Sequence, residues 1–248
     1  MILRYVVFAL LALLLMYLLI LNVCCLLVNP GKEYDKHSPF YRFLLNSATA
    51  MAMKLLRIRV HISGMEKIPK NTKALFVSNH RSNFDPIITW YALRKWKIAF
   101  ISKPSNFKIP FFGRIIRKCC FMPIDRENPK NAIVTVNKAA KLLKKQEVSI
   151  GIYPEGTRSK HGQLLPFHNG VFKIAQKAEA SIVVLCVTGT EGVSKRTPFR
   201  RTDVYLDVLE VFSAQGIKET KTAMIGTAVR RLMEINIEKR DKQWQKDM

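Results

Sequence analysis

The sequence predicts an α/β domain, with a central mixed or largely parallel sheet flanked by helices, behind an N-terminal hydrophobic helical membrane anchor. Three observations predict this class. The first part of the chain is almost entirely apolar, short β-rich runs alternate with helical patterns beyond residue 57, and 248 residues suffice for one large core. The predicted division is a hydrophobic helical anchor over residues 1–56 and an α/β domain over residues 57–248.

The anchor begins with an apolar segment from Ile2 to Val28, in which only Arg4 and Asn22 are clearly polar. A helix of that length could cross a bilayer whose hydrocarbon core is about 30 Å thick. A secretory signal peptide is the alternative. It is disfavoured because the apolar stretch exceeds the usual hydrophobic region of a signal peptide, and no small-x-small cleavage site precedes the first charges.

A second apolar segment runs from Phe40 to Leu56, after a turn-forming Asn-Pro-Gly sequence at 29–31. The basic residues Arg57 and Arg59 follow it, which suits an interfacial helix at the level of lipid headgroups. An ordinary core helix of the α/β domain accounts for the apolar residues equally well. Periodicity does not separate a membrane-facing surface from a protein-facing one, so both interpretations stay open.

Beyond the anchor, β-rich runs alternate with helical patterns. The predicted strands are 57–63, 74–78, 98–101, 121–124, 149–153, 182–187 and 204–211, and the predicted helices lie near 86–95, 130–146, 170–179 and 216–240. In sheets of this kind ligands bind beyond the carboxyl ends of the strands, where the connecting loops converge. A functional site is therefore expected in the loops that follow the strands.

The chain is strongly basic. Its 41 Lys and Arg residues against 18 Asp and Glu give a formal net charge of +23, which implies an anionic partner such as nucleic acid, a lipid surface or a phosphorylated substrate. Because the cations follow the first segment, the positive-inside rule places the α/β domain on the cytoplasmic side of a cell membrane. A membrane-tethered nucleic-acid-binding protein is disfavoured, since no RNA-binding signature or DNA-reading motif is present. Salt-dependent oligonucleotide binding would test that alternative.

The five cysteines favour a reducing compartment. Four of them form adjacent pairs, at 24–25 and 119–120, and such pairs do not suggest a disulfide framework between segments. Neither pair has the C-x-x-C spacing of a zinc site, and the histidines are scattered. We therefore expect neither a structural metal nor a cofactor.

The strand at 74–78 runs into a loop that carries His80 and Asp85 in an H-x4-D spacing. Across such a loop the carboxylate can fix the tautomer of the imidazole and leave its other nitrogen to accept a proton. This is the base and the orienting group of a hydrolase-like triad, without a serine or cysteine nucleophile. A pair at this spacing also arises by chance, and Asp85 before Pro86 suits a helix N-cap; the two roles are compatible.

Another loop follows the strand at 149–153 and reads Tyr-Pro-Glu-Gly-Thr-Arg-Ser over 153–159. Gly156 permits a tight turn, and the guanidinium of Arg158 can bind a phosphate through two hydrogen bonds. The residues therefore predict an anion-binding turn. For an isolated Gly-Thr-Arg sequence, an exposed turn with a solvated arginine would be the default.

Basic residues also bracket the apolar sequence Pro-Phe-Phe-Gly at 110–113. Apolar residues between cations suit a molecule that is half hydrocarbon and half phosphate. Many of these charged side chains are expected simply to lie on the solvent-exposed surface. Lys103 and Arg114 are the two that we expect to contact a ligand.

Three blocks, in this order, resemble the 1-acylglycerol-3-phosphate acyltransferase family. They are Asn-His-x4-Asp at 79–85, Pro-Phe-Phe-Gly-Arg at 110–114 with Ile-Asp-Arg at 124–126, and Tyr-Pro-Glu-Gly-Thr-Arg-Ser at 153–159. The resemblance covers roughly residues 60–190, and the third block is highly specific.

The resemblance implies an enzyme that transfers a fatty acyl group from acyl-CoA or acyl carrier protein to the sn-2 hydroxyl of lysophosphatidic acid, at a membrane containing anionic lipids. His80 would deprotonate the hydroxyl, and Asp85 would orient His80. Phosphate would be held by Lys103, Arg114 and Arg158. The implied acceptor site comprises Lys103, Gly113, Arg114, Glu155, Gly156, Thr157 and Arg158.

Two departures from the family pattern bear on the acceptor. The strand at 182–187 lacks the proline that members often carry, and His168 stands where many carry a lysine. Acylation of another lysophospholipid or of a lyso-aminolipid therefore stays an alternative. A hydrolase with an acyl-enzyme intermediate is disfavoured, because the chain has no Gly-x-Ser-x-Gly sequence and its cysteines lack an obvious paired base.

Overall fold

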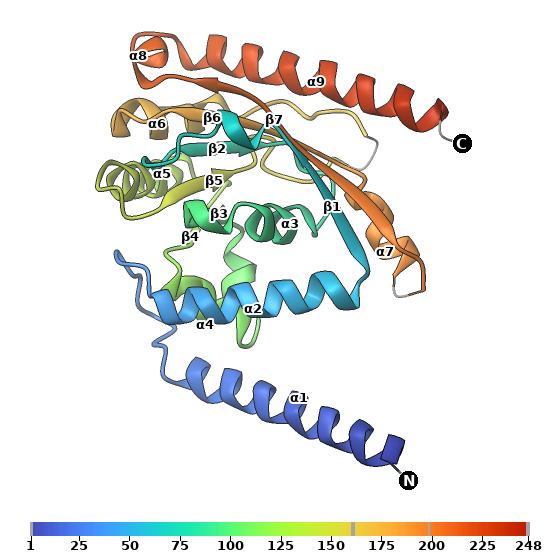
Figure 1. Ribbon diagram of the computed structural model, residues 1–248. Helices are drawn as coiled ribbons and strands as arrows, with labels where there is room; N and C mark the ends of the chain where they lie inside the picture. Colours follow the sequence, from blue (N-terminus) through green and yellow to red (C-terminus); the bar gives the residue numbers. More distant parts are fainter. Residues whose placement is uncertain (1, 160–161, 198, 247–248) are drawn as a thin grey trace.

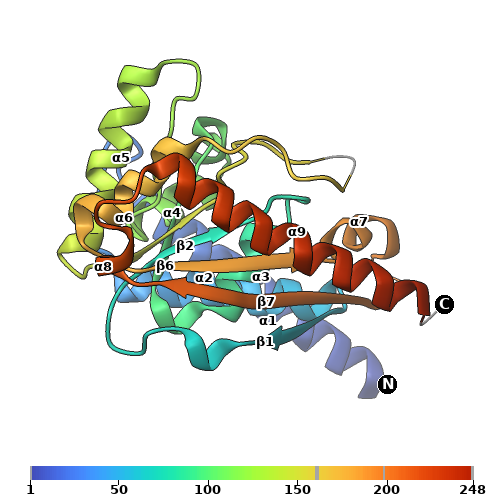
Figure 2. The same cartoon turned by 90° about the horizontal axis from the view of Figure 1, so that it is seen from above.

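The computed structural model describes residues 2–159, 162–197 and 199–246. Over these residues helices cover both faces of a seven-stranded sheet, and the apolar helix α1 lies outside this layered domain (Figure 1 and, from above, Figure 2). The strands are β1 (Ile58–Ser63), β2 (Leu75–Ser78), β3 (Ile98–Ser102), β4 (Met122–Pro123), β5 (Ser149–Ile152), β6 (Ile182–Thr188) and β7 (Thr202–Phe212). The α-helices are α1 (Ile2–Leu26), α2 (Pro39–Leu55), α3 (Asp85–Ala92), α4 (Phe112–Lys118), α5 (Pro129–Lys144), α6 (Lys173–Ala178), α7 (Val193–Arg196), α8 (Ala214–Ile217) and α9 (Thr222–Lys246).

The strand order in the sheet is β1-β7-β6-β2-β5-β3-β4. Neighbouring strands are parallel except β6 and β7, which are antiparallel and shift register between Val184 and Leu185. The sheet is therefore mixed, and the predicted α/β class is confirmed. Every predicted strand is present, with ends that differ from the prediction by at most two residues.

Alternate side chains of the strands enter two hydrophobic cores. In β2, Leu75 and Val77 join the core beneath α5, α6 and α9, whereas Phe76 joins the core beneath α2, α3 and α4. All residues of β2, β5 and β6 are buried. Burial on both faces explains why these central strands appear in the sequence as continuous apolar runs, and it leaves polar chemistry to the loops at the strand ends.

Helix α2 packs one face against α3 and α4. It begins after Ser38, whose hydroxyl accepts a hydrogen bond from the first turn of the helix. Arg42 is 5% exposed and donates to the carbonyls of Ile98 (3.0 Å) and Cys119 (3.2 Å). The core-helix interpretation therefore describes this face. The opposite face exposes Phe43, as an interfacial helix would.

Helix α1 lies along α2 (Figure 1) and is joined to it by hydrogen bonds. The hydroxyl of Tyr17 lies 2.7 Å from that of Ser47, and the Tyr41 hydroxyl donates to the carbonyl of Cys24 at 2.8 Å. Most of its other side chains are exposed. By its length and a mean hydropathy of 2.8, α1 could cross a membrane, which suggests membrane association.

Helix α4 is the main element that the sequence patterns do not predict. Phe111 precedes it with a φ of 60°, and the amide of Phe112 donates to the carbonyl of Pro110 at 2.6 Å, so the chain turns sharply into the helix. Its start coincides with a Pro-Phe-Phe-Gly sequence that is typical of a loop. Helix α4 is stabilised by packing against α2, which is distant in sequence, rather than by the helix propensity of its own residues. The predicted C-terminal helix is also divided, into α8 and α9.

Candidate active site

The loops after β2, β3, β5 and β6 lie at one edge of the sheet, because these four neighbouring strands run parallel. The loop after β2 carries His80, and the loop after its neighbour β5 begins at Tyr153. Lys103 follows β3, and Thr190 follows β6. Within the described part of the chain, no three His, Cys, Asp or Glu side chains gather in a way that could hold a metal ion. The chemistry at this edge is that of a histidine, carboxylates and cations.

His80 and Asp85 form a hydrogen-bonded dyad. Nδ1 of His80 lies 2.8 Å from Oδ2 of Asp85. The aspartate is fully buried, and the histidine side chain is 17% exposed. Because the carboxylate accepts a hydrogen bond from the N–H group at Nδ1, Nε2 is the ring nitrogen that can take a proton from a hydroxyl group.

The Asp85 carboxylate accepts four hydrogen bonds. Besides His80, Oδ2 accepts the backbone N–H groups of Arg81 (2.6 Å) and Ser82 (2.7 Å), and Oδ1 accepts the hydroxyl of Thr190 (2.5 Å). This geometry corrects the helix-cap interpretation. Helix α3 begins at Asp85 itself, and the carboxylate binds amides of the preceding loop rather than those of the helix's first turn. The four donors hold the carboxylate in one orientation toward the imidazole.

Tyr153 supports the imidazole from the end of β5. Its ring stacks on that of His80, with 4.4 Å between centroids and 24° between planes, and also on Phe100 at 5.9 Å. Burial raises the pKa of Tyr153 well above its usual value, so the phenol stays neutral. Tyr153 therefore fixes the plane of the histidine ring without exchanging a proton with it.

Glu155 joins the two loops. Its Oε1 accepts the backbone N–H of His80 at 2.7 Å, and Oε2 accepts that of Leu165 at 2.9 Å. The side chain is 3% exposed, and burial raises the pKa of the carboxyl, against the opposing effect of these two amides. The backbone of Ser159 also donates to the carbonyl of His80 at 2.8 Å. Because both carboxylate oxygens bind backbone amides, the observed position of Glu155 favours shaping the site over contacting the acceptor.

Gly156 makes the turn that exposes the end of the third sequence block. Its φ is 71°, and its amide donates to the carbonyl of Tyr153 at 3.0 Å. A Cβ here would lie 3.0 Å from the ring of His168, so both the backbone conformation and the available space favour glycine. Thr157 and Arg158 follow and are exposed. The guanidinium of Arg158 can therefore bind an anion without leaving a buried partner.

The other predicted acceptor residues are placed differently. Arg114 is half-buried on α4 and donates to the carbonyl of Cys25, at the end of α1, at 3.2 Å. Gly113 lies so close to Phe107 that a Cβ would be 2.4 Å from its carbonyl oxygen, so packing alone requires glycine. Lys103 is exposed directly after β3. Among the described residues, neither cation makes a hydrogen bond to the His80–Asp85 dyad, whereas the loop at 153–159 contacts it directly.

Thr190 is a residue of the site that the sequence motifs do not identify. Its buried hydroxyl donates to the buried carboxylate of Asp85, although the two residues are far apart in sequence. The signal that could have found it is its position. A hydroxyl directly after β6 lies beside the loop that follows β2, because these strands are parallel neighbours.

Thr190→Val is expected to slow any reaction in which His80 acts as the general base by about tenfold, with little change in KM, because valine keeps the volume but removes a donor from a charged acceptor. Steady-state kinetics would measure both constants. Thr190→Ser is the matched control, since it keeps the hydroxyl, and it should retain most of the rate. Equal losses in the two variants would mean that the methyl group, and not the hydrogen bond, matters here.

A family model described as "Acyltransferase" matches residues 59–188, a range that contains the dyad and every predicted acceptor residue. The chain belongs to the acyltransferase family. Members of this family that are similar to it include the 1-acyl-sn-glycerol-3-phosphate acyltransferase of Salmonella typhimurium, which is 31% identical over 170 residues, 68% of this chain and 69% of that protein.

A plant member and a solved structure extend the comparison. The 1-acyl-sn-glycerol-3-phosphate acyltransferase of Cocos nucifera is 34% identical over 150 residues, 60% of this chain and 48% of its own length. This acyltransferase-family chain thus spans about half the length of that relative. The crystal structure of the 1-acyl-sn-glycerophosphate acyltransferase PlsC of Thermotoga maritima matches with a TM-score of 0.67 and 24% identity, over 81% of each chain. At that identity the likeness shows a shared fold.

Proposed function

We propose that the protein is a 1-acyl-sn-glycerol-3-phosphate O-acyltransferase of phospholipid biosynthesis. It would transfer a fatty acyl group from acyl-CoA or acyl carrier protein to the sn-2 hydroxyl of lysophosphatidic acid, giving phosphatidic acid. The observation that carries the proposal is the dyad of His80 and Asp85, which presents a proton acceptor; within the described residues, the imidazole of His80 is hydrogen-bonded to Asp85 and to no serine, threonine or cysteine side chain. Relatives described with this activity support the choice of acceptor.

The dyad supplies general-base catalysis. Nε2 of His80 takes the proton of the acceptor hydroxyl while the hydroxyl oxygen attacks the carbonyl carbon of the thioester. A C–O bond forms and the C–S bond breaks. The proton then passes from the imidazolium to the leaving thiolate, so the products are an ester and a free thiol. Asp85 stabilises the imidazolium between these two proton transfers.

The acceptor phosphate is assigned chiefly to Arg158, which is exposed on the turn next to the dyad. Lys103 and Thr157 are exposed in loops at the same edge of the sheet. Arg114 has one donor on the carbonyl of Cys25 and keeps others for a phosphate oxygen. In this proposal Glu155, Gly156 and Gly113 shape the acceptor site rather than bind the phosphate.

Arg158→Ala is expected to raise the apparent KM for lysophosphatidic acid by about 10- to 150-fold, since a charge-assisted hydrogen bond contributes roughly 1.5 to 3 kcal/mol. Arg158→Lys should restore only part of this, because an ammonium lacks the planar fork. Slow hydrolysis of the thioester by water needs no phosphate contact and should change less. If transfer and hydrolysis fell equally in the same variant, the phosphate assignment would be wrong.

We further propose that residues 1–56 anchor the protein in a cell membrane and that the domain of residues 57–248 acts on the cytoplasmic side. The length and exposed apolar surface of α1 support the anchor. The excess of cations after the first segment supports the orientation, because basic residues are retained on the cytoplasmic side and attracted to its anionic lipids.

The decisive experiment pairs acceptors with donors. The purified full-length protein, in neutral detergent, is assayed with lysophosphatidic acid, other lysophospholipids and a lyso-aminolipid, each with acyl-CoA and with acyl carrier protein thioester. The highest kcat/KM is expected for lysophosphatidic acid. A higher value for another acceptor would reassign the acceptor, and an absence of transfer with every pair would refute acyl transfer.

A further inference from the structure

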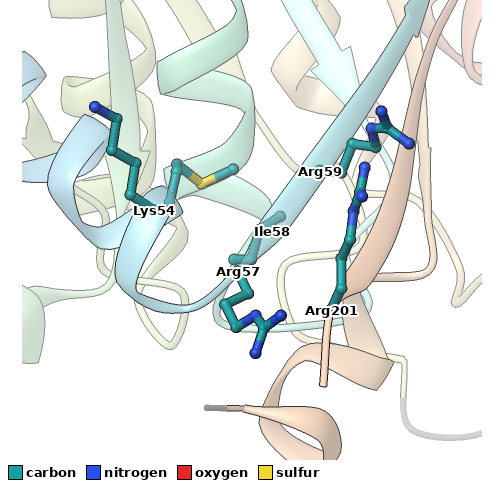
Figure 3. A pocket seen from close by; sticks show the side chains of 6 residues that line it. Lys54, Arg57, Ile58, Arg59 and Arg201 are labelled. Carbon is teal, nitrogen blue, oxygen red and sulfur yellow. The ribbon is translucent and has the colours of Figure 1, made fainter. Parts of the chain in front are cut away.

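A pocket outside the candidate active site lies where α2 ends and where β1 and β7 begin. Its volume is about 350 Å³. Figure 3 shows its lining, which comes from these three segments and comprises Met53, Lys54, Arg57, Ile58, Arg59 and Arg201. Four of these side chains are cationic. The two others add an apolar surface, so the pocket combines the two chemical characters of a phospholipid.

The pocket and the candidate active site lie toward the same edge of the sheet. Strand β7 runs antiparallel to β6, so that Tyr205, near the start of β7, pairs with Thr188 at the end of β6. Ile58 pairs with Thr202, so β1 also begins at this edge. Strands β7 and β6 separate β1 from β2, which puts the two sites on the order of 14 Å apart at about 4.8 Å per strand. One flat surface can therefore reach both sites.

The cations of the pocket exceed the negative charge beside them. Figure 3 shows the guanidinium groups of Arg59, on β1, and of Arg201, which directly precedes the neighbouring strand β7, beside each other in the pocket. Asp203 contacts one of them, with Oδ1 4.0 Å from Nε of Arg201, but the same oxygen lies 2.8 Å from Nε2 of His61. Adjacent guanidinium groups repel each other unless an anion lies between them. The oxygens of a phosphate match their planar donors.

Apolar side chains that face solvent border these cations. Leu55, next to Lys54 in the sequence, is 65% exposed, and Phe199 is 85% exposed. The carbonyl of Phe199 accepts a hydrogen bond from Arg57 at 3.1 Å, which places Phe199 at the rim. The apolar helix α1 lies beside α2, the helix that ends at the pocket (Figure 1). A soluble anion would satisfy only the cations, whereas a lipid at the bilayer surface also covers the apolar side chains.

We propose that this pocket binds the phosphate of an anionic phospholipid in the bilayer, held by Arg59 and Arg201. Leu55 and Phe199 then enter the boundary between headgroups and acyl chains. The bound lipid is a membrane component rather than a substrate. Its role is to hold this edge of the sheet, and with it the loops of the candidate active site, against the membrane surface.

The test uses the full-length protein in neutral detergent micelles, to which phosphatidylglycerol is added in increasing amounts while native mass spectrometry counts bound lipid. Arg59→Gln/Arg201→Gln should raise the half-saturating concentration about 30-fold, since each basic residue at an anionic surface contributes about fivefold. Arg59→Lys/Arg201→Lys keeps the charge and should lose much less. Lys130→Gln/Lys141→Gln is the matched control, because these exposed lysines lie on α5, which packs on α6, β4 and β5 and not on β1 or β7, and it should bind normally.

Three results would overturn the proposal. Phosphatidylcholine could bind as well as phosphatidylglycerol, millimolar inorganic phosphate could displace the lipid completely, or the control pair could lose as much binding as the arginine pair. The first would exclude charge recognition, the second would identify a soluble-anion site, and the third would mean that only net charge matters. Transfer to lysophosphatidic acid in neutral micelles and the melting temperature should be unchanged in the arginine variant. A parallel loss of transfer would instead place the pocket in the acceptor site.

Discussion

Replacement of His80 by alanine is expected to lower acyl transfer by about 10²- to 10⁴-fold, the usual effect of losing a positioned general base. The fold should persist, because the contacts that this residue makes with Glu155 and Ser159 involve backbone groups that alanine retains. Initial rates with lysophosphatidic acid and a thioester donor would measure the loss. Circular dichroism and recovery in the membrane fraction would establish that the variant is folded and inserted.

His61→Ala is the matched control for this experiment. His61 also lies 2.8 Å from an aspartate, Asp203, and stacks on a tyrosine, Tyr205, with 4.8 Å between centroids. It belongs to β1 rather than to the loop after β2, so it should keep near-normal turnover in neutral detergent. If the folded His80→Ala protein also kept near-normal turnover, general-base catalysis by His80 would be refuted.

The sheet could be predicted from the sequence because its central strands are buried on both faces and leave a strong local signal. Local sequence patterns do not identify which strands are neighbours in the sheet. The antiparallel pairing of β6 with β7 and the packing of α4 on α2 depend on segments that are distant in sequence. Arg42 is the clearest case. Its charged side chain lies in the hydrophobic core although the helix that carries it is apolar. The guanidinium is stabilised there because it donates to the carbonyls of Ile98 and Cys119 and lies 4.8 Å from the centre of the Trp90 ring.

The same distinction applies to the candidate site: contacts within one loop could be predicted from the sequence, and contacts between distant segments could not. His80 and Asp85 share one loop, so their spacing was enough to predict the hydrogen bond between them. Glu155 is marked by a motif, but its contacts exist only because β2 and β5 lie side by side, and the motif does not say that its oxygens bind backbone amides. For Arg114 the motif likewise does not include its contact with the end of α1. Thr190 has no motif at all, and only the strand order brings it to the dyad.

Asp85→Asn should lower transfer by about 10²- to 10⁴-fold while leaving the loop in place. The amide oxygen can replace Oδ2 and accept the same three N–H donors, and the NH₂ group then faces the hydroxyl of Thr190, which can rotate to accept it. The substitution thus removes the negative charge that stabilises the imidazolium and keeps most of the hydrogen bonds. Turnover numbers and melting temperatures of the variant and the wild type would measure the two effects separately.

The double variant His80→Ala/Asp85→Asn decides whether the aspartate acts through the histidine. If its role is to orient the imidazole and stabilise its charged form, removing Asp85 costs nothing further once the imidazole is gone. The double variant should then be no slower than His80→Ala alone, although each single variant is severely impaired. If Asp85 served only to hold the loop at 80–82, the two rate losses would multiply, and Asp85→Asn would lower the melting temperature equally with and without His80. Full activity in the Asp85→Asn single variant would leave Asp85 a loop-holding residue and His80 a base that needs no carboxylate.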